Sequence, residues 1–189
     1  CLPGEKVSLF ESKLEGFRFR NSLLESDLQE RAAAIMARTA KLDRSLTNKE
    51  DVIRSFRNIL SKYGANTANA VNESAAFVCL ACKRAFGKKW PIFNKDYRWE
   101  LIPRDTQVQA GLILCDEIEE NRFIRARTGE GKTLIGLFPI AYHSLYGSVH
   151  VVTCNDYLAN RDQQWIGPVL RELGIDSAFL STEEEGKRE

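Results

Sequence analysis

An eight-residue segment near the middle of the chain constrains its fold more than any other feature. Residues 126–133 have the form A-x-x-x-x-G-K-T, with glycine at positions 129 and 131. Glycines at these places let the backbone turn so that its N–H groups face one concavity. A helix that begins there adds its positive N-terminal end. The pattern therefore predicts a phosphate-binding loop that joins a strand to a helix.

The polar positions of this loop have expected roles. Lys132 is long enough to reach the β and γ phosphates of a nucleotide, and the Thr133 hydroxyl is the expected protein ligand of Mg²⁺. Glu130 is an acid within an anion site, so its side chain should point away from the phosphates. The loop residues expected to bind ATP are Thr128, Gly129, Glu130, Gly131, Lys132 and Thr133. The alternative is a loop that turns a strand into a helix without any ligand.

Gln107 is the second candidate for the ATP site, and it lies upstream of the loop. A glutamine carboxamide donates and accepts at once, which matches the edge of adenine and selects ATP over GTP. A lone glutamine near a helix start is usually a solvated side chain. Its place before a motor-type loop favours base recognition instead.

Apolar spacing predicts that residues 1–90 form an N-terminal helical region. A Ser22/Glu25 capping box opens the first helix, a Thr47/Glu50 box opens a second that ends at Gly64, and a third spans residues 74–86. The aromatic-rich residues 87–103 predict an irregular, packed connection. Two short features on this part allow two interpretations each. Cys79 and Cys82 fit a buried helix face better than a metal site, and the bases Lys83, Arg84, Lys88 and Lys89 fit a solvated helix end or an anionic-lipid contact.

Residues 91–189 predict the first part of an α/β lobe that is incomplete at its C-terminal end. Helices are expected near residues 108–118, 132–146 and 156–173, and strands at 123–126, 149–153 and 175–180. Pro139 should kink the second helix, Asn155 should cap the third, and Gly174 should end it. Strands that alternate with helices in this order predict a partial parallel sheet with helices on its faces.

Composition removes some classes of protein and leaves others open. The 189 residues carry 27 Lys and Arg against 26 Asp and Glu, so the net charge of +1 provides no electrostatic footprint for nucleic acid. Five cysteines, an odd number, favour a reduced, cytosolic setting.

Residues 133–155 lack Asp, Glu, Lys and Arg over a length that could cross a bilayer. Pro139 and the turn at Gly147 instead favour a buried helix, a turn and a strand.

Four stretches together resemble the SecA preprotein-translocase ATPase family, in the first part of its first nucleotide-binding lobe. Residues 127–133 match the family's R-T-G-E-G-K-T loop, and residues 150–162 are similar to its V-V-T-x-N-D-Y-L-A-x-R-D segment. Residues 105–111 and 75–87 resemble its D-V-Q-L-x-G-G segment and the helix before that. The likeness is good from about residue 75 onward. It departs at Arg104, at residues 109–110 and at Cys154.

This resemblance implies a P-loop RecA-like motor lobe, preceded by helices, that uses ATP and Mg²⁺. It implies a motor that couples ATP hydrolysis to the movement of unfolded preproteins through the SecYEG channel. The implied partners are the preprotein, the channel, anionic membrane lipids and a second copy in a homodimer, with no nucleic acid. The implied location is cytoplasmic and peripheral, on the inner face of the cell membrane. A superfamily 2 RNA or DNA helicase is the alternative motor, and a nucleotide-binding module without turnover is a third interpretation.

The resemblance also bears on catalysis. The family's Mg²⁺-binding carboxylates lie beyond the position of Glu189, so the chain is expected to be a fragment that is inactive alone. Residues 112–117 end in Asp116 and Glu117 and imitate that motif. They precede the loop, however, and suit a helix end better. No catalytic residue is therefore identified in these 189 residues.

Overall fold

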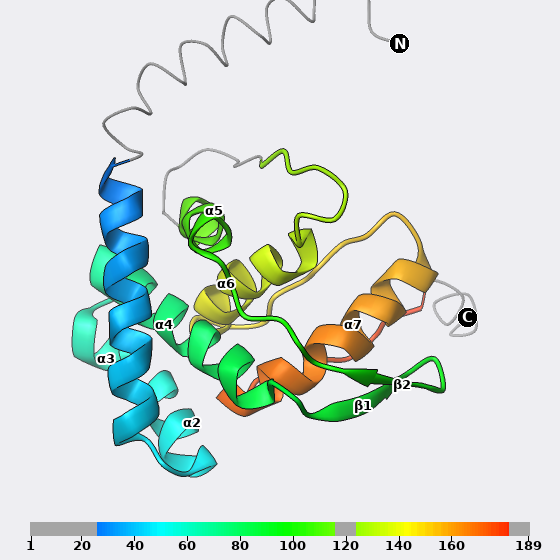
Figure 1. The fold of residues 1–189 in the computed structure, drawn as a ribbon, viewed down its shortest axis with the longest axis horizontal. Coiled ribbons are helices and arrows are strands. Elements are labelled where there is room, and N and C mark those ends of the chain that lie inside the picture. Colours follow the sequence, from blue (N-terminus) through cyan, green and yellow to red (C-terminus); the bar gives the residue numbers. More distant parts are fainter. Residues whose placement is uncertain (1–25, 116–123, 182–189) are drawn as a thin grey trace, which may run out of the picture.

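The computed structural model describes residues 26–115 and 124–181, and helices make up most of this part (Figure 1). A first helix spans residues 26–45 and is drawn in blue. The elements after it are α2 (Lys49–Arg57), α3 (Ile59–Tyr63), α4 (Ala68–Ala85), β1 (Lys89–Ile92), β2 (Lys95–Arg98), α5 (Asp105–Cys115), α6 (Lys132–Ser144), α7 (Asp156–Leu170) and the 3₁₀ helix η1 (Arg171–Leu173).

Helix α4 is the centre around which the other helices pack. It contacts α2, α3, α5, α6, α7 and η1, and it buries side chains on all sides, including Phe77 and Leu80. A helix that is apolar all round is a core helix. Thr67 starts it by accepting a hydrogen bond from the Ala70 N–H with its hydroxyl, 3.1 Å away. Because of this cap, α4 begins six residues before the start predicted at Ser74.

The N-terminal helices lie against α4 rather than apart from it. Ala32, Ile35 and Leu42 of the first helix are buried in the same hydrophobic cluster as α4 to η1. The Arg38 guanidinium also donates two hydrogen bonds to the buried Glu73 carboxylate on α4, at 2.8 and 2.5 Å. The division of the chain at residue 90 stays a prediction. The buried cluster itself runs across that position.

The helix predicted after Thr47 is two helices in the structure. Asn48, not Thr47, is the N-cap of α2, since its side chain accepts from the Asp51 N–H at 2.8 Å. At Asn58 the backbone leaves helical geometry, with φ −85° and ψ 2°, and α3 starts afresh at Ile59. Gly64 ends α3 with φ +81°, as the sequence predicts. The box at Ser22 lies outside the described residues.

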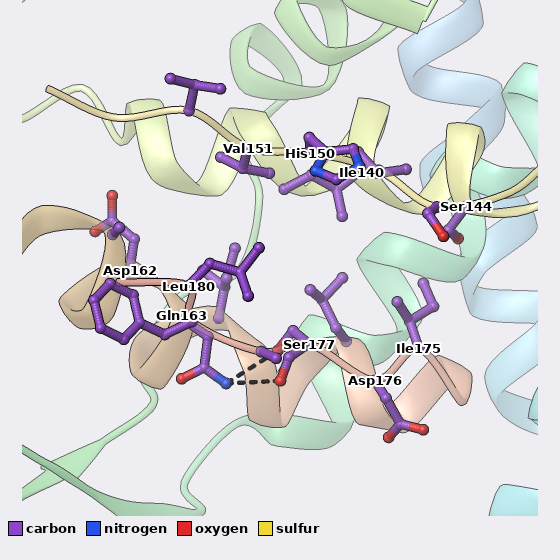
Figure 2. Close-up of a pocket in the computed structure, with 18 of the residues that line it drawn as sticks. Ile140, Ser144, His150, Val151, Asp162, Gln163, Ile175, Asp176, Ser177 and Leu180 are labelled. Carbon is purple, nitrogen blue, oxygen red and sulfur yellow. Dashed lines mark hydrogen bonds between the residues drawn. The ribbon is translucent and has the colours of Figure 1, made fainter. Parts of the chain in front are cut away.

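The three predicted strands do not form in the described part of the chain. Residues 124–126, 149–153 and 175–180 have no strand geometry, so the parallel sheet expected from them is absent there. Figure 2 shows how the last two of these segments, 149–153 and 175–180, are arranged. They run along opposite sides of a groove of about 1210 Å³, and no backbone hydrogen bond between described residues joins them. A strand is stable only beside a hydrogen-bonding neighbour.

The region predicted as an irregular connection contains a β-hairpin instead. Strands β1 and β2 pair antiparallel, with Trp90 opposite Tyr97, around a two-residue turn. Phe93 and Asn94 have φ of +46° and +65°, as a tight hairpin turn of this kind requires. Trp90 stacks on Trp99, and Tyr97 packs edge-on against Trp165 of α7. The hairpin therefore depends on contacts with a helix far along the chain.

Candidate nucleotide-binding site

The predicted loop leads directly into a helix, as the motif predicts, but the described residues before it, 124–126, do not form the predicted strand. Helix α6 begins at Lys132, and Gly131 is its N-cap with φ +82°. Gly129 has φ +88°, and a Cβ built there would meet nothing within 4 Å. These left-handed conformations are ones that residues other than glycine rarely adopt. The loop is therefore an open turn at the positive end of a helix, which is the geometry that binds phosphate.

Lys132 folds back over the loop that precedes it. Its Nζ donates to the carbonyl oxygens of Ala126 at 2.8 Å and of Arg127 at 3.1 Å. Both acceptors come from the first residues of the motif, so the ammonium group spans the loop. The side chain is exposed, and leaving these carbonyls for a phosphate would replace two neutral acceptors with a charged one.

Glu130 points toward the first half of the loop. Its Oε2 accepts a hydrogen bond from the Arg127 N–H at 3.0 Å, and its own N–H donates to the Arg127 carbonyl at 3.3 Å. Within the described residues, the carboxylate has no hydrogen bond to the backbone of 131–133, where α6 begins. This agrees with an acid that faces away from a bound anion.

Gln107 lies directly behind the loop and is buried, with 6% of its surface exposed. Its Nε2 donates to the Glu130 carbonyl at 2.9 Å. Its Oε1 accepts from the Arg104 N–H at 3.0 Å, the reciprocal contact of a capping box at the start of α5. Sequence reasoning missed this capping role, although Arg104-x-x-Gln107 has the spacing of such a box. Among the described residues, each polar atom of the carboxamide has one hydrogen-bond partner.

The loop residues fit a nucleotide and a magnesium ion in their chemistry. The space around Gly129 is open, and Lys132 supplies a cation at the loop. The Thr133 side chain is half-buried, and its hydroxyl has no hydrogen-bond partner among the described residues, so it is free to ligate Mg²⁺. Bound Mg²⁺ would neutralise phosphate charge. The described residues contain no cluster of three His, Cys, Asp or Glu that could hold a metal ion without a nucleotide. Asp116 and Glu117 lie outside the described residues.

The segment that follows residues 149–153 opens α7 with local contacts. Asn155 caps the helix as predicted, because its Oδ1 accepts from the Leu158 N–H at 2.9 Å. Arg161 pairs with the adjacent Asp162 at 2.6 Å, and the Asp156 carboxylate accepts from the Ser181 hydroxyl at 3.0 Å. Gly174 ends η1 with φ +72°. Asn155, Arg161 and Asp162 thus make the local contacts of a capped helix start.

The two cysteines at helical spacing are buried side chains on α4. Burial raises the pKa of the Cys79 thiol to about 12, and it raises the pKa of Cys82 as well. Both thiols are therefore protonated at neutral pH, which disfavours metal binding. This result agrees with the predicted buried face. Among the described cysteines only Cys154 is exposed.

Most of the basic patch predicted near the end of α4 has partners within the molecule. Lys83 pairs with Asp43 at 2.6 Å and Lys88 with Glu172 at 3.0 Å. Arg84 donates to the Leu46 and Asn48 carbonyl oxygens. Lys89 alone of the four has no partner among the described residues. The contacts of Lys83 and Arg84 hold α4 against its neighbours.

Comparison with known proteins identifies the family. A model of the SecA DEAD-like domain matches residues 18–189. The chain belongs to this SecA family. A protein translocase subunit SecA from Chlorobium phaeobacteroides (strain BS1) is 32% identical over 187 residues, which is 91% of this chain and 18% of the relative. One from Chlorobium phaeovibrioides (strain DSM 265 / 1930) is 35% identical over 130 residues, 66% of this chain and 12% of the relative.

Membership of the SecA family supports a RecA-like lobe, because that is the architecture of DEAD-like domains. The chain spans about a fifth of the length of these curated SecA relatives. No helix in the described part of the chain is both long and apolar enough to cross a membrane.

Proposed function

We propose that this chain is the ATP-binding part of a SecA-type motor. The observation that carries the proposal is the loop at the start of α6, where two left-handed glycines open the backbone and Lys132 spans it. In the complete motor, ATP hydrolysis would be coupled to the movement of unfolded preproteins through the SecYEG channel. The relatives are named translocase subunits, which supports this assignment.

Titration of the 189-residue chain with MgATP tests the binding step. We expect weak, saturable binding that Lys132→Ala removes, because the variant loses the cation that spans the loop. Thr133→Ala should remove the Mg²⁺ dependence of binding while weak magnesium-free binding persists. Equal affinity of the wild type and Lys132→Ala for MgATP would contradict the proposal.

Hydrolysis is expected to need more than this chain. No carboxylate cluster is found among the described residues, and a lobe that supplies Mg²⁺-positioning acids would have to complete the site. We therefore propose that the 189 residues bind ATP without turning it over. Phosphate release above the Lys132→Ala background would contradict this part of the proposal.

The groove of Figure 2 supports a further part of the proposal, the completion of a parallel sheet. His150 and Val151 lie on one side, Ile175 and Leu180 lie on the other, and no backbone hydrogen bond between described residues joins the two segments. We infer that a strand from outside the described residues pairs with both segments in the complete motor. Hydrogen exchange should then show amides 149–153 and 176–180 slow in the complete motor and fast in the 189-residue chain.

A superfamily 2 helicase is the second candidate, and the two motors differ in what stimulates them. A translocase should turn over ATP faster with unfolded preprotein and SecYEG-containing membranes, and respond little to RNA. A helicase should do the reverse, with a steep salt dependence from phosphate contacts. Turnover of the complete motor with each stimulant in turn distinguishes them. RNA stimulation without a preprotein effect would replace the translocase assignment.

Anionic lipids, a homodimer and a position on the inner face of the cell membrane complete the proposal, and they rest on family resemblance. A flotation assay with anionic and neutral vesicles tests the lipid contact. Lys89→Glu is the suitable variant, because Lys83 and Lys88 are already paired within the molecule. Binding to anionic vesicles that is no stronger than to neutral ones would remove lipids from the list of partners.

A further inference from the structure

Glu130 makes three hydrogen bonds within the protein, although it is an acid in the middle of a predicted anion-binding loop. Its carboxylate accepts from the Arg127 N–H at 3.0 Å, and its N–H donates to the Arg127 carbonyl at 3.3 Å. Its carbonyl accepts from the Gln107 side chain at 2.9 Å. Two of these contacts close a reciprocal ring between residues 127 and 130. The third ties that ring to α5.

The ring lies immediately before the part of the loop that would hold phosphate. Gly131 follows Glu130 directly and is both left-handed and crowded, because a Cβ there would lie 2.5 Å from Gln107 Nε2. The direction of the N–H groups at 131–133 is thus set by how the chain leaves residue 130. Binding groups held in place before the ligand arrives avoid the entropy cost of ordering them during binding.

We propose that Glu130 is a positioning residue that holds the phosphate loop in its binding conformation through the Arg127 N–H. This inference rests on the proposed nucleotide binding. The contact requires the reach of the side chain and an acceptor oxygen, not a negative charge. The negative charge of the Glu130 carboxylate is unfavourable beside a triphosphate. The hydrogen bond from the Arg127 N–H holds this carboxylate at the other half of the loop.

Three variants separate reach from charge. Glu130→Gln keeps the reach and an acceptor oxygen but loses the charge. Glu130→Asp keeps the charge but is one methylene too short, and Glu130→Ala loses both. We expect Glu130→Ala and Glu130→Asp to bind MgATP about three- to tenfold more weakly than the wild type, the scale of one lost hydrogen bond. Glu130→Gln should recover most of the affinity. Circular dichroism should show equal helix content in all four proteins.

A second measurement does not depend on nucleotide. Trypsin cleaves after Arg127, which is exposed, at a rate that follows local opening of the loop. Without nucleotide, Glu130→Ala and Glu130→Asp should be cut at Arg127 several times faster than the wild type and Glu130→Gln. This comparison tests the loop contact even if the wild type binds no ATP, an outcome that would refute the proposed function separately.

Two results with these variants would contradict the proposal. If Glu130→Gln binds MgATP as weakly as Glu130→Ala, the charge rather than the hydrogen bond matters and the proposal is wrong. Equal cleavage of all four proteins at Arg127 would likewise show that the contact does not hold the loop.

Discussion

The side-chain amide of Gln107 donates a hydrogen bond to the backbone carbonyl of Glu130, 2.9 Å away and 23 residues later in the chain. The contact joins the first turn of α5 to the phosphate loop before α6. The same side chain caps α5 through Arg104. A residue predicted to recognise a base is therefore also part of the support of the loop.

Replacing Gln107 should affect ATP and GTP differently. Gln107→Ala removes the contact with Glu130 for every nucleotide, and it also removes the donor and acceptor that match adenine. We expect weaker binding of both nucleotides and a preference for ATP over GTP that falls about tenfold or more. Titration of the wild type and the variant with each nucleotide measures both effects. An unchanged ATP-to-GTP ratio would show that Gln107 supports the loop without selecting the base.

Gly111 of α5 and Gly136 of α6 offer a matched test of helix packing. A Cβ at Gly111 would lie 2.4 Å from Cγ of the buried Phe138, whereas one at Gly136 would meet nothing within 4 Å. We expect Gly111→Ala to lower the free energy of unfolding by about 1–3 kcal/mol through overpacking. Gly136→Ala should be neutral or raise it by up to about 1 kcal/mol. Urea unfolding measures both, and equal effects would contradict the α5–α6 contact.

The cysteines should differ strongly in reactivity. Because burial raises the pKa of the Cys79 and Cys82 thiols, little nucleophilic thiolate is present at pH 8, and reagent access is also blocked. Exposed Cys154 should react with a disulfide reagent within minutes, while Cys79 and Cys82 react only after denaturation. Mass spectrometry of peptides from the labelled native protein identifies the sites. Rapid native labelling of Cys79 would show that α4 is not buried as described.

The same thiols predict that stability falls in alkali. The Cys79 pKa is 9.0 in the absence of burial and about 12 in the folded protein. Between these values the unfolded chain releases a proton that the folded chain retains, so the free energy of unfolding decreases as pH rises, by about 1.4 kcal/mol per pH unit for one thiol. Urea unfolding from pH 9 to 11 measures the slope. A Cys79→Ala/Cys82→Ala variant provides the control, and an identical slope in that variant would exclude the thiols as its cause.

The sequence by itself determined the features whose causes are local. The glycines of residues 126–133 permit a left-handed backbone, and the structure has φ of +88° and +82° at Gly129 and Gly131. Asn155 and Gly174 begin and end their helical segment as predicted, because a cap is a contact within a few residues. The sequence likewise predicted a helix over residues 74–86 with a buried face at Cys79 and Cys82, and both cysteines are buried on α4.

Tertiary structure alone decided the features that depend on a distant partner. The hairpin of β1 and β2 is stabilised by Trp165 on α7, and the Arg38–Glu73 pair joins residues 35 positions apart. No pattern near Gln107 indicates that it contacts Glu130. The apolar residues at 149–153 and 175–180 predict strands, yet a strand forms only beside a neighbour that accepts and donates its backbone hydrogen bonds. Hydrophobic pattern is local information, and hydrogen-bonded pairing is not.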